Sequence, residues 1–284
     1  MTTDPNALQV VPAARLPTSI RLALLGGGSI ANTVAKSVRD GKLAGVEIVG
    51  VVSASSPPSE RVRATARHVD ARVGTLDDIL ALDPDWVLEA AGAEAVRQHL
   101  PRLVASRAGL IIMSIGAVLD PNVWALVAAK RAAGGKVLLP SGAIGGLDAV
   151  SALNALGDLQ SVSITTTKAP AGLATAPYLV ERGMGLSVSE PQVVFMGSAR
   201  DAVRGFPSNV NVAAALSLAG IGPDLTTVRV VSDPSCTRTN HTIQAEGSSG
   251  RLYVEVESSP NPMNPGSSYL AALSAVDAVR RVVG

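Results

Sequence analysis

The first half of the chain alternates short apolar runs with amphipathic segments. The apolar runs are rich in Val, Leu and Ile and are shorter than most helices, so they predict buried parallel strands over 19–25, 46–53, 86–90, 110–114 and 136–140. Helical periodicity predicts helices between them, over 30–40, 60–68, 75–82, 94–106 and 121–133. This alternation predicts an α/β fold of the Rossmann type, a doubly wound parallel sheet with helices on both faces.

The pattern changes after residue 160. Apolar and polar residues alternate over 161–168, 226–233, 241–247 and 251–257, which predicts a mixed, largely antiparallel sheet with one solvated face. The last segment, 267–283, is helical, and we expect one stripe of it to be buried against the first domain. That stripe consists of Leu270, Leu273, Val276, Val279 and Val283.

These patterns divide the chain into three parts. Residues 1–18 are mixed and contain proline, and we expect a loose tail. Residues 19–140, together with the helix 267–284, are predicted to form a dinucleotide-binding Rossmann domain. Residues 141–266 are predicted to form a second, smaller α/β domain, which would hold the substrate, the catalytic residue and the contact of a homodimer.

Composition narrows the class of protein. Hydrophobic residues make up 47% of the chain and aromatic residues 2%, so the core must consist of Ala, Val, Leu and Ile. Few aromatics and a net charge of +1 argue against nucleic acid as a partner. No apolar run reaches the length of a membrane span, so we expect no membrane partner. The single cysteine, Cys236, has no neighbours at metal-ligand spacing, so we expect no metal site and a cytoplasmic protein.

A glycine loop follows the first predicted strand. Gly26, Gly28 and Ala31 match the pattern G-x-G-x-x-A between a strand and a helix. The first glycine allows the tight turn, the second lets the backbone approach a pyrophosphate, and the small third residue lets the helix pack on the strand. Ser29 and Ile30 begin the helix, where free N–H groups would face the phosphates. The alternative is a tight turn with no ligand, but the context of βαβ units favours a nicotinamide dinucleotide.

The end of the second strand bears on the choice between NAD and NADP. The position that often carries an acid for the ribose 2′-hydroxyl is Ser53, and Arg61 and Arg63 follow. Without a carboxylate to repel a 2′-phosphate, we expect NADP to be at least tolerated. The alternative, that both arginines are the solvated face of a helix, is equally compatible with the sequence.

Three histidines are candidates for proton transfer. His68 ends a charged helix and His99 lies within an amphipathic one, so we expect a surface position and a structural position, respectively. His241 lies beside an alternating strand in the second domain and is best placed to face a cleft between domains; the alternative is a hydrogen-bonded loop residue. We predict Cys236 to be a small buried residue rather than a nucleophile. Glu89 ends a predicted strand, and we do not predict it to be a catalytic acid.

Several separated motifs lie between residues 114 and 265. They are Ser114-Ile115-Gly116-Ala117, Pro140-Ser141-Gly142-Ala143-Ile144-Gly145-Gly146-Leu147-Asp148, Phe206-Pro207-Ser208-Asn209-Val210-Asn211-Val212-Ala213-Ala214, Asn240-His241 and Asn261-Pro262-Met263-Asn264-Pro265. With the glycine loop, this combination resembles the L-aspartate dehydrogenase family from about Ser19 to the C-terminus.

The resemblance implies a Rossmann domain joined to a smaller α/β domain. It also implies a reaction: oxidation of L-aspartate by NAD or NADP to iminoaspartate, which hydrolyses to oxaloacetate and ammonia, and the reverse reductive amination. Some members of the family feed iminoaspartate to NAD biosynthesis, and members are usually oligomeric. By similarity, His241 is the catalytic residue, and Ala143 and Asn211 contact the cofactor near its nicotinamide end.

A substrate with two carboxylates calls for basic groups. Lys168, at the end of an alternating strand, is the first candidate and Arg238 the second; a solvated surface charge is the alternative for each. Asn209 and Asn211 would point to one side of an extended segment, so one could hold a carboxamide; the alternative is a cap for a helix over 212–218. The family's terminal motif often reads Asn-Pro-Lys-Thr-Ser, and here Gly266 replaces the lysine.

The missing lysine keeps other functions open. One alternative is a related dehydrogenase or imine reductase that acts on another amine or carbonyl compound. Another is a cofactor-binding protein without turnover, because fold alone does not determine function.

Overall fold

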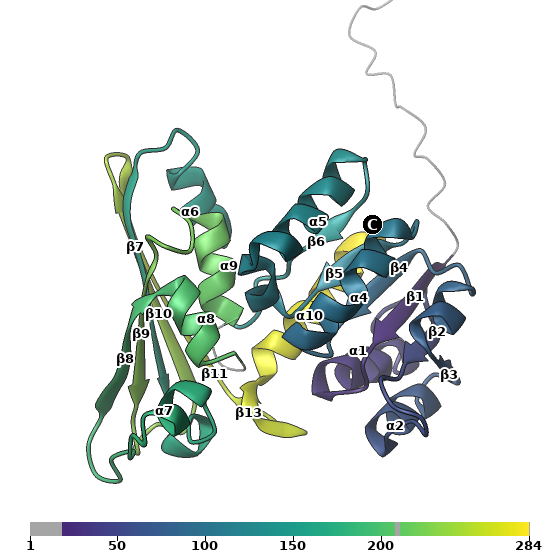
Figure 1. The fold of residues 1–284 in the computed structure, drawn as a ribbon, viewed down its shortest axis with the longest axis horizontal. Helices are drawn as coiled ribbons and strands as arrows, with labels where there is room; N and C mark the ends of the chain where they lie inside the picture. Colours follow the sequence, from purple (N-terminus) through teal and green to yellow (C-terminus); the bar gives the residue numbers. More distant parts are fainter. Residues whose placement is uncertain (1–18, 208–210, 284) are drawn as a thin grey trace, which may run out of the picture.

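The computed structural model describes residues 19–207 and 211–283, which form two domains side by side (Figure 1). The predicted tail, residues 1–18, lies outside the described residues. The first domain contains a six-stranded parallel sheet in the order β3-β2-β1-β4-β5-β6. Its strands are β1 Ile20–Leu25, β2 Val46–Val52, β3 Arg72–Gly74, β4 Trp86–Glu89, β5 Gly109–Ile112 and β6 Val137–Leu138. The predicted Rossmann-type sheet is confirmed.

Helices cover both faces of this sheet. They are α1 Ser29–Arg39, α2 Glu60–Arg67, α3 Leu76–Leu80, α4 Ala93–Ala105 and α5 Pro121–Ala132. The 3-10 helix η1 Ile115–Leu119 lies between β5 and α5. Side chains alternate along β1: Leu22 and Leu24 pack into one buried cluster, while Ala23 and Leu25 pack into the cluster on the opposite face. This explains why β1, β2, β4 and β5 are mainly apolar, since both faces of the sheet are covered there.

The second domain is built on a five-stranded mixed sheet in the order β11-β10-β7-β9-β8. Its strands are β7 Leu159–Lys168, β8 Gln192–Ser198, β9 Thr227–Ser232, β10 Thr239–Gly247 and β11 Gly250–Ser258. Only β7 and β9 pair in parallel; the other neighbours are antiparallel, as the alternating pattern predicts. The other elements of this domain are α6 Leu147–Leu153, η2 Pro170–Gly172, α7 Pro177–Glu181, α8 Ala199–Gly205 and α9 Asn211–Ala219.

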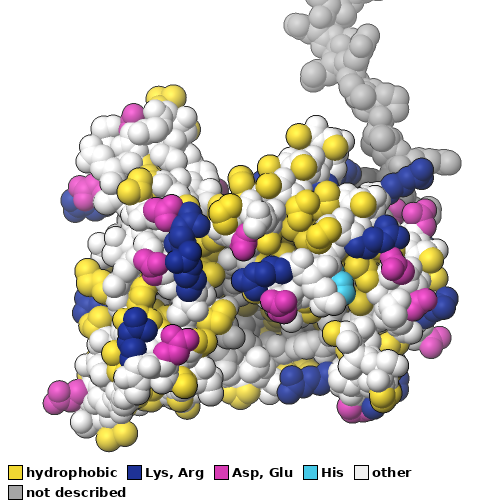
Figure 2. All heavy atoms as spheres, viewed as in Figure 1, with side chains coloured by type: hydrophobic (Ala, Val, Ile, Leu, Met, Phe, Trp, Pro, Cys, Tyr) yellow, Lys and Arg dark blue, Asp and Glu magenta, His cyan; other side chains and the backbone are white. Residues whose placement is uncertain are grey.

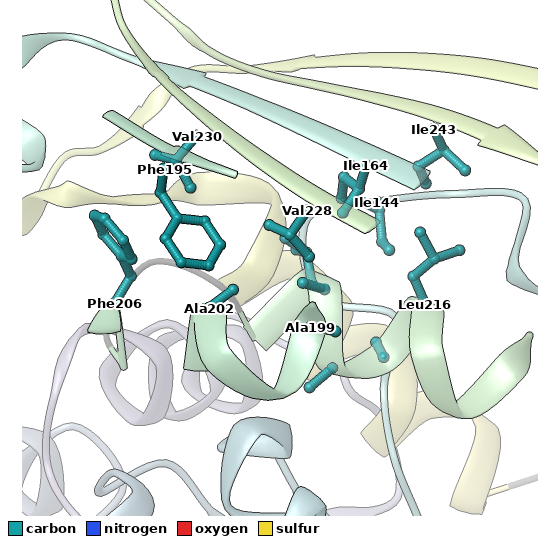
Figure 3. Packing of buried hydrophobic residues seen from close by; sticks show 14 of the residues in the cluster. Ile144, Ile164, Phe195, Ala199, Ala202, Phe206, Leu216, Val228, Val230 and Ile243 are labelled. Atoms are coloured by element: carbon teal, nitrogen blue, oxygen red, sulfur yellow. The ribbon is translucent and has the colours of Figure 1, made fainter. Parts of the chain in front are cut away.

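The core of the second domain lies on one face of this sheet. Figure 3 shows Val228, Val230 and Ile243 pointing from the strands toward side chains of α8 and α9, including Leu216. The opposite face of the sheet carries Val193, Met196 and Tyr253, which are exposed. One-sided burial is the physical origin of the period of two in these strands.

The C-terminal helix returns to the first domain. α10, Tyr269–Val283, packs beside α1 (Figure 1). Its Val276 and Val279 belong to the buried cluster on that face of the Rossmann sheet. Leu273 is 41% exposed, so its predicted place in the buried stripe is wrong. Alanines take the close contacts instead, because a small side chain lets two helices approach each other: Ala272, Ala275 and Ala278 are buried.

The structure contains elements that the pattern did not predict. The three-residue β3 is too short to show a period, and β8 has an irregular burial pattern because its register shifts between Val193 and Phe195. The segment before α10 forms a hairpin of β12 Pro260–Asn261 and β13 Asn264–Ser268 rather than the start of the helix. Within the described residues, every helix is too short or too polar to cross a bilayer.

Candidate active site

A cavity of about 770 Å³ lies between the two domains. In the space-filling view, the molecule is hollowed between its two halves on the face shown (Figure 2). The first domain contributes the glycine loop, the first turns of α1 and α2, and the segments that follow β4 and β5. The second domain contributes the ends of β7 and β10, the start of α9, and the β12–β13 hairpin.

The glycine loop has the geometry of a phosphate cradle. Gly26 has φ +99°, and a Cβ there would lie 2.9 Å from the Ala91 Cβ; a Cβ on Gly27 would lie 2.5 Å from the Val62 Cα. Gly28 lines the cavity, and a Cβ there would meet only the Ala90 carbonyl oxygen, at 3.8 Å. A Cβ on Gly28 would therefore project into the space that a ligand needs.

The start of α1 supplies the donors for that cradle. Gly28 is its N-cap, no side chain caps it, and its first turn contains no acidic residue. Ser29 and Ile30, in the first turn of α1, line the cavity. The free N–H groups and the positive end of the helix dipole are therefore directed at the cavity, which suits the pyrophosphate of a dinucleotide. Ala31 is fully buried in the core and serves the packing of α1 on the sheet.

The α2 end of the cavity distinguishes the two candidate arginines. Arg61 lines the cavity, whereas Arg63 donates to Glu60 and to the Pro58 carbonyl oxygen, at 3.1 and 2.6 Å. Ser53 does not line the cavity, and its hydroxyl donates to the Ser55 carbonyl oxygen at 2.8 Å. The structure thus places Arg61, and not Ser53 or Arg63, at the cavity.

His241 lies on β10 and faces the inner end of the cavity. Thr166 on β7 is its antiparallel partner, and the Thr166 Oγ1 lies 3.0 Å from the His241 Nδ1. The imidazole is 2% exposed. Burial and the positive charge of Lys168 lower the pKa of His241 to about 3, so the ring is neutral at physiological pH.

Lys168 lies beside His241 in the same cavity. It ends β7 two residues after Thr166, on the same face of the sheet, and its Nζ lies 3.5 Å from the Gly266 carbonyl oxygen of the hairpin. Burial lowers the pKa of Lys168 to about 8. An ammonium group and a neutral imidazole therefore share the inner end of the cavity, where they could bind a carboxylate and exchange a proton.

Two further predicted cofactor contacts, Ala143 and Asn211, lie in the second domain. Ala143 is buried and lines the cavity. Asn211 begins α9, lines the cavity, and accepts a hydrogen bond from the Gly116 N–H at its Oδ1, 2.9 Å away. Because Oδ1 is engaged, the amide NH2 is the group with which Asn211 can donate to a ligand carbonyl. Asn209 lies outside the described residues.

Arg238 is not at the cavity. Its side chain is 60% exposed and lies 3.9 Å from Glu257. Arg238 precedes β10, which begins at Thr239, and it lies on the surface beside Glu257 of the edge strand β11. A guanidinium in water also avoids the cost of burial.

The remaining titratable candidates, which are His68, His99, Cys236 and Glu89, do not line the cavity. His68 is half-buried beside Arg39, and His99 is half-buried on α4. Burial raises the pKa of the Cys236 thiol, which favours the protonated form over a nucleophilic thiolate. Glu89 is buried and fully hydrogen-bonded behind the cavity wall.

The structure also shows residues of the site, and one residue behind it, that the sequence predictions did not include. Thr166 orients His241, and only the pairing of β7 with β10 reveals it. The hairpin contributes Met263, Asn264 and Pro265, which belong to the motif over residues 261–265, to which the sequence analysis assigned no chemistry.

Comparisons with known proteins agree with this geometry. Residues 26–140 match the family model described as "Homoserine dehydrogenase, NAD binding domain", and residues 148–282 match "Aspartate dehydrogenase, C-terminal". The L-aspartate dehydrogenase of Methanosarcina mazei is 34% identical over 93% of this chain and 97% of the relative, and that of Methanopyrus kandleri is 38% identical over 93% and 96%. The crystal structure of aspartate dehydrogenase from Thermotoga maritima superposes with a TM-score of 0.69 at 24% identity, over 93% of this chain and 96% of that one, and shows the same fold. The chain is an amino-acid dehydrogenase with an NAD-binding domain, and it belongs to the L-aspartate dehydrogenase family.

Proposed function

We propose that this enzyme oxidises L-aspartate to iminoaspartate with NAD or NADP, and that it catalyses the reverse reductive amination of oxaloacetate with ammonium. The imine formed in the oxidative direction would hydrolyse to oxaloacetate and ammonia. One observation carries the proposal: neutral His241 and Lys168 share the inner end of a cavity whose outer end is a dinucleotide cradle.

The bound nicotinamide cofactor supplies the acceptor for the hydride on the substrate Cα. The substrate amine must be unprotonated for that transfer, so a group has to take a proton from the ammonium. His241 is that group in our proposal, because its ring is neutral and Thr166 occupies Nδ1, which leaves Nε2 for the substrate. Thr166 also holds the ring in one orientation, and in our proposal the Nδ1–H donates to the Thr166 hydroxyl, so that Nε2 carries the lone pair that accepts the proton.

The low pKa of His241 describes the cavity without substrate. Burial and Lys168 lower it, and a bound dicarboxylate brings negative charges that act in the opposite direction. Substrate binding therefore raises the basicity of His241 when the base is needed. Lys168 pairs with one carboxylate through a charge-assisted hydrogen bond and loses its unfavourable effect on the ring.

Arg61 supports the use of NADP. Glu60 also lines the cavity, but it is paired with Arg63 and Arg67, which offset its negative charge. Arg61 lines the cavity and forms no ion pair with any residue that the structure describes, so its guanidinium is available to a 2′-phosphate.

A related substrate with one carboxylate is the second candidate. Gly266 stands where the family often has a lysine, and it offers a carbonyl oxygen to Lys168 rather than a second positive charge. Among the cavity-lining residues that the structure describes, Lys168 is the only lysine. A panel of 2-oxo acids with ammonium tests this candidate: a higher kcat/KM with a monocarboxylate than with oxaloacetate would favour it.

We also propose that the enzyme is a cytoplasmic homodimer. The exposed face of the second sheet, with Val193, Met196 and Tyr253, offers an apolar contact, and the free thiol of Cys236 suits a reducing compartment. Light scattering of the parent and of Met196→Glu tests the dimer: the variant should be monomeric if this face is the contact.

The direct test follows the absorbance of the reduced nicotinamide with oxaloacetate, ammonium, and either NADH or NADPH. We expect oxidation by the parent and a loss of about 10²-fold or more in kcat for His241→Ala, with dinucleotide binding retained. If the parent protein binds NADH or NADPH but does not oxidise it, the proposed reaction is refuted while the dinucleotide site is still supported.

A further inference from the structure

Glu89 is a buried carboxylate that the proposed chemistry does not use. It ends β4, near the middle of the Rossmann sheet, and is 2% exposed. Its Oε1 accepts hydrogen bonds from the N–H groups of Ala91 and Gly92, at 2.8 and 2.9 Å, and from the hydroxyl of Ser114 at 2.9 Å. Its Oε2 accepts from the Ser114 N–H at 3.0 Å.

Every one of these partners is a donor to the carboxylate. An ionised carboxylate only accepts, so it satisfies all four, whereas a protonated carboxyl or an amide would place a hydrogen toward one of them. Burial raises the pKa of Glu89, and the hydrogen bonds from Ser114, Gly92 and Ala91 act against that rise. The four-donor geometry fits the charged form.

The hydrogen bonds join two segments of the cavity wall. Ala90 and Gly92 follow β4, and Gly92 is the N-cap of α4; Met113, Ser114 and Ile115 follow β5. All five of these wall residues line the cavity, while Glu89 itself lies behind them. Glu89 thus fixes the spacing of two adjacent segments without touching a ligand.

The connection continues into the second domain. Ser114 is the N-cap of η1, and the Gly116 N–H of η1 donates to Asn211 at the start of α9, at 2.9 Å. The contact is tight, because a Cβ on Gly116 would lie 3.0 Å from the Asn211 Oδ1. Glu89 is therefore connected to the domain that carries His241 by its hydrogen bonds with Ser114, by the backbone from Ser114 to Gly116, and by the hydrogen bond from Gly116 to Asn211.

We propose that Glu89 is a positioning residue: its carboxylate sets the wall of the cofactor cleft and, through Ser114, η1 and Asn211, the placement of the second domain against that wall. The inference rests on the proposed function for the reaction that is being positioned. Displacement of reacting groups by about 1 Å can reduce turnover about 10²-fold, so such a residue should act mainly on kcat.

The test uses Glu89→Gln, Glu89→Asp and Ser114→Ala. Gln removes the charge and turns an NH2 toward donors, whereas Asp keeps the charge but is one methylene shorter and cannot span the same distance. Ser114→Ala removes one hydroxyl and leaves the backbone donor. Ser217→Ala is the matched control, because this equally buried hydroxyl donates within α9, to the Ala214 carbonyl oxygen, and does not line the cavity.

We expect Glu89→Gln and Glu89→Asp to lower kcat about 10-fold or more, with KM for the substrate changed by less than about threefold. In the unliganded proteins, hydrogen exchange of η1 and of the first turn of α9 should be faster for these variants and for Ser114→Ala, but not for Ser217→Ala. A normal kcat in Glu89→Asp would show that charge alone matters and would overturn the positioning role.

Unchanged exchange at η1 and α9 would also overturn the proposal. If Glu89→Gln does not fold, hydrogen exchange of Ser114→Ala decides: faster exchange at η1 and α9 supports the proposal, and unchanged exchange overturns it. Hydrogen exchange needs no substrate, so a parent that proves inactive with aspartate would refute the proposed function while exchange still tests the connection from Glu89 to Asn211.

Discussion

The buried imidazole of His241 makes the stability of the protein depend on pH in a defined window. Its pKa is about 3 in the folded protein and about 6.5 in an unfolded chain. The unfolded state therefore binds more protons than the folded state between these values, so the contribution of His241 to stability is fully present above about pH 6.5 and is lost as pH falls toward 3. The full difference corresponds to about 5 kcal/mol, of which about 2 kcal/mol is lost between pH 7 and pH 5.

His241→Gln isolates this contribution, since glutamine is neutral at both pH values. The free energy of unfolding is measured from urea curves followed by circular dichroism at pH 7 and pH 5. We expect the loss on acidification to be smaller in the variant than in the parent by about 2 kcal/mol. His99→Gln, a change to a half-buried histidine outside the cavity, measures the effect of removing a histidine as such. Equal losses in parent and His241→Gln would refute the neutral buried imidazole on which the proposed proton transfer depends.

Three further predictions concern the charge and the packing around the cavity. Lys168→Met should raise KM for oxaloacetate about 10-fold or more, because a charge-assisted hydrogen bond is lost, and the parent's KM should rise above about pH 8 as Lys168 loses its proton; steady-state kinetics between pH 7 and 9.5 would contradict this if KM stayed level. Arg61→Ala should weaken binding of NADPH about 10-fold while NADH changes little, as measured by fluorescence titration; equal losses for both would assign Arg61 to the shared part of the cofactor. Leu24→Ala, in the middle of β1, should cost about 2–5 kcal/mol of unfolding free energy in urea, and a cost below about 1 kcal/mol would contradict its place in the core.

The Rossmann half of the fold was accessible from the sequence because its signals are local. The strands β1, β2, β4 and β5 are apolar runs, and the glycine loop follows the first strand directly, so the cradle could be placed without long-range information. β3 and the β12–β13 hairpin are too short to carry a period, and the hairpin sequence, rich in Pro, Asn and Gly, reads as a loop. β3 forms because it pairs with β2, and β12 and β13 form because they pair with each other.

At the inner end of the site, the alternation of side chains along a strand predicts which residues share a face, but it does not predict which residues of two strands lie opposite each other. Thr166 and Lys168 share a face of β7, and His241 shares the buried face of β10 with Ile243. The register that sets Thr166 opposite His241 depends on how β7 pairs with β10, and no signal within either strand determines it.

The route of the chain explains how the two halves of the site stay together. The hairpin lines the cavity and leads directly into α10, whose Ala271 also lines the cavity and whose Val279 is buried in the Rossmann core. The turn between β11 and α10 is fixed, because the Ser258 hydroxyl accepts hydrogen bonds from the Ser268 hydroxyl and from the Leu270 N–H. A movement of the second domain would therefore have to strain this turn or withdraw apolar residues of α10 from the core, and burial of apolar surface opposes withdrawal. The C-terminal helix thus holds the domain that carries His241 against the domain that carries the glycine loop, and this is why a helix far from the glycine loop in sequence belongs to the architecture of the site.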